Sequence, residues 1–339
     1  MKILHYVGDR SGVFLYRAYY PSIALQDYTD ANVLFSRNCS VMNPESLAEM
    51  AWCDVAVFHR QYIKQVVEAM RHLKKIGKKV IFEIDDDWMN LNPDNQFQKS
   101  LDKNPQILEG LKKASTEADY ITVTNKRLAK EMSKFNKNIK ILPNYISSYF
   151  FDYNLVPQEK EKDCVNLLWS GASNHLDNMK SLVEPLKILF EKYDNIKLWI
   201  IGSNYAYLFP FIPKSKFRWC PWTGLENYAS GITFGDIGLA PMVDNKFNAS
   251  KSDIRVLEYG YMGLPVVASD IYAYKETLTH GKNGFLAKST DDWVNYLSML
   301  IEDKKLRKKM SREVKKMAIR NTIENNYDKY LDFYKELVA

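Results

Sequence analysis

The stretch that decides the fold covers residues 236–269 and reads DIGLAPMVDNKFNASKSDIRVLEYGYMGLPVVAS. It begins with a short apolar run at Ile237–Ala240, passes through a polar loop, and continues with helical periodicity over Asp253–Met262. Gly263-Leu264-Pro265 then ends the helix, and a β-branched run reaches Ser269. A strand, a crossover helix and a second strand in this order predict parallel strands of one sheet.

The same alternation of short apolar runs and longer helical segments fills both halves of the chain. Because crossover helices cover both faces of a parallel sheet, we expect an α/β protein of two doubly wound domains. The expected strands are Ile3–Val7, Asn32–Phe35, Val55–Phe58, Val80–Ile84, Tyr120–Val123, Ile139–Leu142, Val165–Trp169, Lys197–Ile201, Phe217–Trp219, Ile237–Ala240 and Pro265–Ser269. The expected helices include Ile63–Ile76, Met179–Tyr193, Asp253–Met262, Asp291–Ile301, Lys305–Arg320 and Ile323–Leu337.

The length and one charged segment predict where the domains meet. A chain of 339 residues suits two cores of roughly 150 residues each better than one. The polar run Pro157–Asp163 is typical of a linker, and the strand and helix pattern begins again after it. We therefore expect an N-terminal domain over 1–150, a linker over 151–163, a second domain over 164–320 and a closing helix over 321–339.

The composition is that of a globular protein in a reducing compartment. Hydrophobic residues make up 46% and charged residues 26%, which argues against disorder. No apolar run reaches the roughly 20 residues that span a bilayer, and the N-terminal apolar run is expected to be a first strand rather than a signal peptide. The four cysteines are scattered, without metal or disulfide spacing, so we expect a cytoplasmic protein, with peripheral membrane contact left open.

The first candidate site is the loop after the first expected strand. Ligands of open parallel sheets bind beyond the carboxyl ends of the strands. The loop Gly8–Val13 lacks the third glycine of a dinucleotide fingerprint, yet its glycines, Gly12 among them, suit a closely approaching anion or sugar. A tight strand-to-helix turn without a ligand is an equal alternative. Acceptor contacts are expected from this region and from the loop after the third strand, at Asp9, Arg10, Arg17 and Arg60.

Acidic residues follow the fourth expected strand, at Asp85-Asp86-Asp87, just before Trp88. Adjacent carboxylates repel one another, so a metal, arginines or a hydroxylated ligand should compensate them. We expect Asp86 to act as a general base or sugar-hydroxyl acceptor without a metal, with Asp85 and Asp87 on the acceptor side. A solvated loop and an Asp-x-Asp metal site are the alternatives. Trp88 is expected on the acceptor side, as a sugar-stacking platform or as core.

In the second half, Ser170–His175 follows one strand and precedes a helix. Small residues at Gly171 and Ser173, with Asn174, allow backbone N–H groups to face a phosphate. His175 is expected to be catalytic from its place at the ligand-facing edge, although a single histidine is as often structural.

The loop before the helix over Asp253–Met262 carries the strongest candidate site. Ser250, Lys251 and Ser252 lead into the helix, and Arg255 lies in its first turn. Exposed amides, the helix dipole and the cations Lys251 and Arg255 together predict a diphosphate seat. Glu258 lies further along the helix, where its carboxylate is expected to accept hydrogen bonds from ribose hydroxyls.

At these residues the chain resembles the retaining glycosyltransferases with two facing Rossmann-like domains, the GT-B fold, of glycosyltransferase family 4 ("group 1"). The likeness covers nearly the whole chain and is strongest over Asp236–Ser269, with its Asp-x-Gly-Leu-x-Pro strand, Leu-Glu-Tyr helix and Gly-Leu-Pro turn. The family resemblance is weaker at three further segments, Ala118–Thr124, Leu142-Pro143-Asn144 and Gly171–His175. The last helix resembles the family's closing helix, which crosses back to the N-terminal domain.

The resemblance implies roles for single residues and also shows departures from the family. Glu258 matches the second glutamate of the family's Glu–seven residues–Glu motif, which holds the donor ribose, while the first falls at Ser250. The family's arginine and Lys-Gly pair after the first strand of the donor domain is missing as well. Diphosphate charge would then be met by Lys251 and Arg255, or by Arg10 and Arg17. The segment that matches the base-binding loop is Cys220-Pro221-Trp222-Thr223.

The function implied by this resemblance is sugar transfer from a nucleoside diphosphate sugar, a UDP- or GDP-sugar, to a glycan, lipid-linked glycan or similar acceptor. It implies retention of configuration, no metal and no cofactor. One alternative is a glycosyltransferase that acts on modified bases of viral DNA, with the basic helix 304–316 on phosphates or on an anionic membrane. A solvated helix face is the plainer interpretation of those cations. Another alternative is a non-catalytic sugar-nucleotide-binding or scaffold protein, and a sugar-nucleotide epimerase is less favoured.

Overall fold

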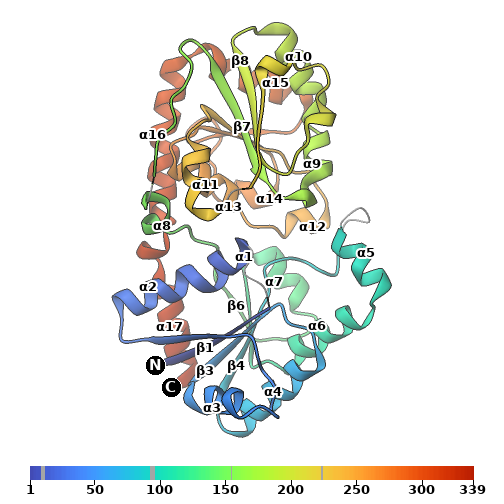
Figure 1. Ribbon diagram of the computed structural model, residues 1–339, viewed down its shortest axis with the longest axis vertical. Helices are drawn as coiled ribbons and strands as arrows, with labels where there is room; N and C mark the ends of the chain where they lie inside the picture. Colours follow the sequence, from blue (N-terminus) through green and yellow to red (C-terminus); the bar gives the residue numbers. More distant parts are fainter. Residues whose placement is uncertain (9–11, 92–95, 154, 223) are drawn as a thin grey trace. The chain divides into compact units, whose positions relative to one another are not determined.

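The computed structural model describes residues 1–8, 12–91, 96–153, 155–222 and 224–339. The chain forms two compact units (Figure 1). Unit 1 comprises Met1–Tyr145, Ser250–Ser252 and Ile323–Ala339, and unit 2 comprises Ile146–Ala249 and Asp253–Thr322. The predicted Asp9 and Arg10 of the first loop, and Thr223 of the base-binding loop, lie outside the described residues.

Unit 1 is built on a six-stranded parallel sheet in the order β2-β1-β3-β4-β5-β6. The central strands are buried except for one end residue each, because helices cover both faces, which explains their apolar runs. The strands are β1 (Lys2–Val7), β2 (Asn32–Ser36), β3 (Val55–His59), β4 (Lys79–Glu83), β5 (Tyr120–Val123) and β6 (Ile139–Ile141).

The helices of unit 1 cover this sheet with one apolar face each. In α4 (Lys64–Lys75) the buried positions Val66, Met70 and Leu73 recur at helical spacing, as the periodicity predicted. The other helices are α1 (Gly12–Phe14), α2 (Tyr20–Tyr28), α3 (Pro44–Trp52), α5 (Gln96–Lys103), α6 (Gln106–Glu117), α7 (Lys126–Met132) and α17 (Tyr327–Val338), with a π-helical turn at Leu15–Tyr19 between α1 and α2.

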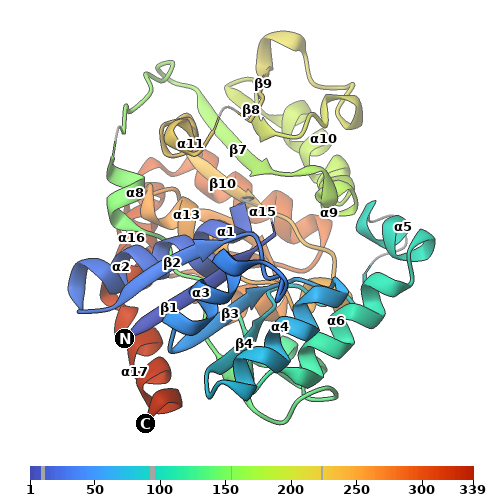
Figure 2. The same cartoon turned by 60° about the horizontal axis from the view of Figure 1, so that its bottom comes forward.

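The closing helix α17 belongs to unit 1, although unit 2 precedes it in the chain. Both termini therefore lie in unit 1, where the red helix runs beside the blue N-terminal elements (Figures 1 and 2). Tyr327 stacks on Tyr28 of α2 with ring centroids 5.1 Å apart, and Phe333 meets Tyr120 of β5 edge to face. The apolar face of α17 is thus part of the core of unit 1.

Unit 2 contains a second six-stranded parallel sheet in the order β12-β11-β10-β7-β8-β9. Its strands are β7 (Val165–Gly171), β8 (Ile196–Gly202), β9 (Phe217–Cys220), β10 (Ile237–Ala240), β11 (Val266–Ser269) and β12 (Phe285–Ala287). Two parallel sheets, each covered by helices, confirm the predicted two-domain α/β fold. β12 was not predicted from the sequence.

The helices of unit 2 are α8 (Ser148–Asp152), α9 (Leu176–Lys180), α10 (Val183–Lys192), α11 (Leu225–Ile232), α12 (Lys246–Ala249), α13 (Ile254–Tyr261), α14 (Tyr272–Lys275), α15 (Thr290–Glu302) and α16 (Lys304–Arg320). The single helix predicted over Met179–Tyr193 is wrong, since α9 ends and α10 begins within it. The Ser181 hydroxyl donates to the Asn178 carbonyl at 2.7 Å, which competes with a continuous helix. Ser289 caps the N-terminus of α15 and forms a capping box with Asp292.

The described residues of the segment expected as a linker, 151–153 and 155–163, belong to unit 2 and include several that are fixed by hydrogen bonds. The Val156 amide donates to the Ser230 hydroxyl at 3.0 Å, and the Gln158 amide donates to the Thr233 hydroxyl at 2.9 Å. Lys160 pairs with Asp236 at 2.9 Å. A charged surface segment can therefore be fixed in place by polar contacts that its composition does not reveal.

Candidate functional site

The first group of candidate residues lies at the carboxyl end of β7 in unit 2. Arg255, in the first turn of α13, donates from Nε to the Ser170 carbonyl at 3.0 Å and stacks over the Trp169 ring at 5.3 Å. The guanidinium is buried, with 8% of the residue exposed. Among the described residues, no carboxylate forms an ion pair with Arg255. A buried cation without a carboxylate ion pair at this edge of a sheet favours an anionic ligand.

Gly171 is the residue that makes room for this cation. A Cβ atom placed on Gly171 would lie 2.7 Å from Trp169 Cζ2 and 2.9 Å from Arg255 Nη2, closer than side chains tolerate. The guanidinium therefore occupies the space that any other residue at position 171 would fill. Gly171 acts by leaving this space free, in addition to the backbone role that the sequence predicted.

His175 lies against the same guanidinium. Its Nε2 is 3.1 Å from Arg255 Nη2, and its Nδ1 is 3.0 Å from the amide nitrogen of Asn178. The structure thus brings together three residues predicted from sequence, Gly171, His175 and Arg255. Ser173 and Asn174 form the exposed part of the short 3₁₀ turn that leads to His175.

Glu258 is the carboxylate of this corner. It lies on α13 with 7% of the residue exposed, and the Tyr228 hydroxyl donates to its Oε2 at 2.7 Å. Burial and the neighbouring Glu258 raise the pKa of Tyr228 well above its usual value, so this phenol keeps its proton and remains a donor. Trp222 lies 5.1 Å from the Tyr228 ring and is 53% exposed, as an aromatic surface for a nucleobase would be.

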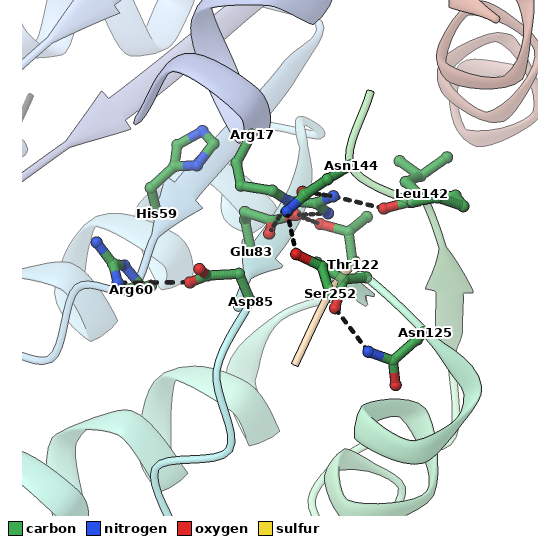
Figure 3. A network of polar contacts seen from close by, with 12 residues as sticks. Arg17, His59, Arg60, Glu83, Asp85, Thr122, Asn125, Leu142, Asn144 and Ser252 are labelled. Carbon is green, nitrogen blue, oxygen red and sulfur yellow. Dashed lines mark hydrogen bonds and ion pairs between the residues drawn. The ribbon is translucent and has the colours of Figure 1, made fainter. Parts of the chain in front are cut away.

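The second group of candidate residues lies at the carboxyl ends of β1, β3 and β4 in unit 1, around a small pocket. The pocket is lined by Val7, Gly8, Val13, Phe14, Arg17, His59, Arg60, Glu83 and Asp85. Figure 3 shows several of these side chains converging from neighbouring elements. The predicted Gly12 lies at the start of α1, next to the lining residue Val13, and is exposed.

Arg17 is buried in an ion pair and is therefore no free cation for a diphosphate. The π-helical turn turns it inward, where Nε and Nη2 hold the two oxygens of Glu83 at 2.7 and 2.9 Å. Nη1 donates to the Leu142 carbonyl and, at 3.0 Å, to the Asn144 side chain (Figure 3). The expectation that Arg17 contacts a ligand's phosphates is thus replaced by a role inside the network.

The three adjacent aspartates point to three different partners. Asp85 pairs with Arg60 at 3.5 Å, Asp86 pairs with Lys251 at 3.2 Å, and Asp87 accepts from the Met89 amide and, at 2.8 Å, from the Asn90 side chain. Compensation by an arginine, one of the predicted possibilities, is found for Asp85, whereas the partner of Asp86 is a lysine. The carboxylates do not converge on one point.

Asp85 has the most perturbed environment of the three. Burial raises the pKa of its carboxyl to about 6, while the Arg60 charge opposes that rise. Its buried Oδ1 is the oxygen paired with Arg60 at 3.5 Å, and it accepts no hydrogen bond from a described residue. Arg60 is held in the left-handed backbone region at φ 50°, which is uncommon for a residue with a Cβ and frequent at functional sites.

His59 lines the same pocket and contacts a second buried histidine. His59 Nε2 lies 2.7 Å from His5 Nδ1, and burial lowers the pKa of His5 to about 3 and that of His59 well below its usual value. Both rings are therefore neutral.

The predicted Trp88 is 8% exposed and lies in the hydrophobic core beside Tyr62. This favours a role in the core over one as a sugar-stacking platform.

The tripeptide Ser250–Ser252 packs in unit 1, although α12 and α13 on either side of it belong to unit 2. Asn125 donates to the carbonyl of Ser250 at 2.8 Å, and Asn144 donates to the Ser252 hydroxyl at 2.9 Å. Lys251 and Arg255, expected in one diphosphate seat, therefore pack with different units. No role was predicted for Glu83, Asn125 or Asn178, because each acts through a partner distant in the chain: Arg17, Ser250 and Val243 respectively.

Three comparisons place this geometry among known proteins. The family model described as "Glycosyl transferases group 1" matches residues 254–317, which begin at α13 and so contain Arg255 and Glu258. A search of curated protein sequences finds no match. Likeness to solved structures, by contrast, extends over nearly the whole chain.

The similar structures share the fold at low sequence identity. A glycosyltransferase from Rickettsia africae ESF-5 has a TM-score of 0.67 at 15% identity, covering 99% of this chain and 98% of that one. A sucrose-phosphate synthase from Thermosynechococcus elongatus reaches 0.66 at 12% identity, covering 99% and 98%. Anabaena HepE, solved in complex with UDP, reaches 0.64 at 12% identity, covering 99% of both chains. These likenesses establish the two-domain fold.

Proposed function

We propose that this chain is a glycosyltransferase that moves a sugar from a nucleoside diphosphate sugar to a hydroxylated acceptor, such as a glycan or lipid-linked glycan. The observation that carries the proposal is Arg255, a buried cation without a carboxylate partner among the described residues, at the carboxyl end of β7. It lies in the segment that matches the group 1 glycosyltransferase model. UDP in the similar Anabaena structure supports a nucleoside diphosphate as the ligand.

The proposed donor site occupies the edge of unit 2. Arg255 and His175 would bind the diphosphate, Glu258 would accept hydrogen bonds from the ribose hydroxyls, and Trp222 would contact the base. In sugar transfer, negative charge develops on the departing diphosphate as its bond to the sugar breaks. Fixed donors around that diphosphate lower the barrier because they are already oriented when the charge appears.

The proposed acceptor site is the pocket of unit 1. Its cations and carboxylates neutralise one another, which suits an uncharged hydroxylated molecule better than an anion. Asp85 Oδ1 is a buried acceptor that an incoming hydroxyl can satisfy. Lys251 donates a hydrogen bond to Asp86, the base expected from sequence, whereas Asp85 Oδ1 is paired with Arg60 at 3.5 Å and accepts no hydrogen bond from a described residue, so we propose Asp85 as the main contact of the acceptor hydroxyl. Retention of configuration and independence of metal belong to this proposal and rest on the family resemblance.

A donor-hydrolysis and transfer assay in EDTA tests the proposal. Arg255→Ala is expected to lower kcat by about 10²- to 10³-fold, the usual cost of removing one donor to a developing charge. Lys251→Ala is expected to cost less than Arg255→Ala, because Lys251 pairs with Asp86 in unit 1 and is not one of the proposed diphosphate donors. The matched control is Lys309→Ala on the exposed face of α16, which should keep normal turnover. A chain that binds donors but turns none over would instead be a sugar-nucleotide-binding scaffold.

A further inference from the structure

The imidazole of His175 lies between two groups that can only donate hydrogen bonds. The Asn178 amide nitrogen faces Nδ1 at 3.0 Å, and the guanidinium Nη2 of Arg255 faces Nε2 at 3.1 Å. A neutral imidazole accepts at one nitrogen and donates from the other. In one of the two contacts, therefore, two N–H donors face each other, and a bound acceptor atom is needed to satisfy both.

The orientation of the Asn178 side chain decides which contact this is. The backbone amide of Val243 donates to Asn178 Oδ1 at 2.9 Å, and a backbone N–H identifies its partner as the oxygen. Asn248 Nδ2 also donates to this oxygen at 3.2 Å, and the orientation of Asn248 is fixed in turn by its bond to the Val243 carbonyl at 2.8 Å. Asn178 and Asn248 are 3% and 2% exposed, so water does not compete for these bonds.

We propose that Asn178 is a positioning residue that keeps the proton of His175 on Nε2, so that His175 and Arg255 together bind one anionic oxygen. Nδ1 accepts from the Asn178 NH₂ group, which leaves Nε2–H and the Arg255 Nη2–H as two donors at the same place. An oxygen within hydrogen-bond distance of both nitrogens satisfies both of them. Naming that oxygen as one of the donor's diphosphate rests on the proposed function.

Trp169 holds the two donors in this arrangement. Its ring lies under the Arg255 guanidinium at 5.3 Å and meets the His175 ring edge to face at 6.0 Å. Trp169 is completely buried in β7, so neither donor has to be ordered when the ligand binds. Preorganisation of this kind is what makes charge-stabilising donors effective.

The first test is the position of the proton in the unmodified protein. Nitrogen-15 NMR separates the two tautomers of each imidazole, and His175→Gln identifies the His175 signals among the five histidines. The expected result at pH 8 is an imidazole with its proton on Nε2. Added pyrophosphate should shift the NMR resonance of Nε2 far more than that of Nδ1. An Nδ1–H imidazole in the free protein would overturn the proposal without any variant of Asn178 having to fold.

The second test is Asn178→Asp, which keeps the shape of the side chain. One carboxylate oxygen still accepts from Val243 and Asn248, while the other replaces the NH₂ group and accepts from Nδ1–H. Nε2 then becomes an acceptor that closes onto Arg255. Pyrophosphate and UDP should bind roughly 10- to 100-fold more weakly, the loss of one hydrogen bond to a charged group.

Asn195→Asp is the matched control, because it makes the same charge change at an exposed residue just before β8, at the opposite end of the strands. Equal affinity of Asn178→Asp and Asn195→Asp for pyrophosphate would contradict the proposal. If pyrophosphate shifts the Nε2 resonance of His175 but no nucleoside diphosphate sugar binds, the positioning role of Asn178 stands and the glycosyltransferase proposal fails. If UDP binds while Nε2 does not respond, the positioning role fails instead.

Discussion

The pocket of unit 1 and the β7 corner of unit 2 both lie at the carboxyl ends of parallel strands, yet they treat charge in opposite ways. In unit 1 the described candidate cations are paired with carboxylates: Arg17 with Glu83, Arg60 with Asp85 and Lys251 with Asp86. In unit 2, Arg255 faces His175, the Ser170 carbonyl and Trp169, and no described carboxylate pairs with it. The difference indicates a neutral ligand for unit 1 and an anionic ligand for unit 2.

The largest effect on this comparison is expected from Gly171→Ala, which moves Arg255 without removing its charge. The new methyl group would overlap Trp169 and Arg255, so we expect UDP affinity to fall roughly tenfold or more and stability to fall by about 1–3 kcal/mol. Calorimetric titration with UDP and thermal unfolding measure the two effects.

Gly231→Ala is the control, since its added methyl group meets only the flexible end of Ile201 at 3.2 Å. Unchanged UDP affinity in Gly171→Ala would mean that the position of the guanidinium does not matter for the anion.

A smaller and pH-dependent effect is expected from Asp85→Asn in unit 1. The pKa of Asp85 is raised from 3.8 to about 6, so the folded state binds this proton more tightly than the unfolded state. The unfolding free energy therefore falls as pH rises from about 4 to about 6, and Asp85→Asn removes that part of the fall. If ionised Asp85 contacts the acceptor, turnover should rise with pH around 6, and the substitution should abolish this rise.

Asp253 is the natural control for this experiment. Burial also raises its pKa to about 6, but its carboxylate accepts from Thr277 and lies outside the pocket of unit 1. Asp253→Asn should reduce the pH dependence of the melting temperature in the same direction and leave the rise in turnover near pH 6 in place. Loss of that rise in Asp253→Asn alone would assign the titration to unit 2.

The smallest effect on turnover is expected from the basic face of α16, where the cations are exposed to solvent and outnumber the acids of the helix. Lys304, Lys305, Lys308, Lys309, Arg312, Lys315, Lys316 and Arg320 are all exposed, against the single acid Glu313 of this helix. Lys309→Glu with Arg312→Glu should leave UDP affinity within about twofold, because exposed charges are screened by salt. The same pair should abolish any salt-dependent binding to duplex DNA or anionic vesicles, measured by mobility shift and co-sedimentation.

The fold could be predicted from sequence because its signals are local. The bounds of Tyr120–Val123 and Ile237–Ala240 were predicted as the structure has them, since short apolar runs between helices are sufficient evidence for buried strands. The hydroxyl of Ser181, which ends α9, and the polar contacts of segment 151–163 depend on partners that periodicity does not reveal. Among the described residues, no helix is long and apolar enough to cross a membrane.

The candidate site could be predicted in its residues but not in its pairings. Arg17, Asp85, His175 and Arg255 were singled out because they follow strands. Arg17 forms an ion pair with Glu83, which lies 66 positions away in the sequence, and only the folded chain brings the two residues together. Lys251 pairs with Asp86 in unit 1, while Arg255 packs in unit 2, so the two cations do not belong to the same unit. This also depends on how the tripeptide Ser250–Ser252 packs.

The most direct test of the anionic site in unit 2 is a thermal-shift panel of UDP-, GDP- and ADP-sugars in EDTA, on the unmodified chain and on Arg255→Ala. A donor at a hundred times its Kd adds about 2.7 kcal/mol to the unfolding free energy. We expect one donor class to raise the melting temperature of the unmodified chain and not that of Arg255→Ala. No shift with any donor, or an equal shift in Arg255→Ala, would contradict the account, and a shift that appears only with Mg²⁺ would contradict its metal independence.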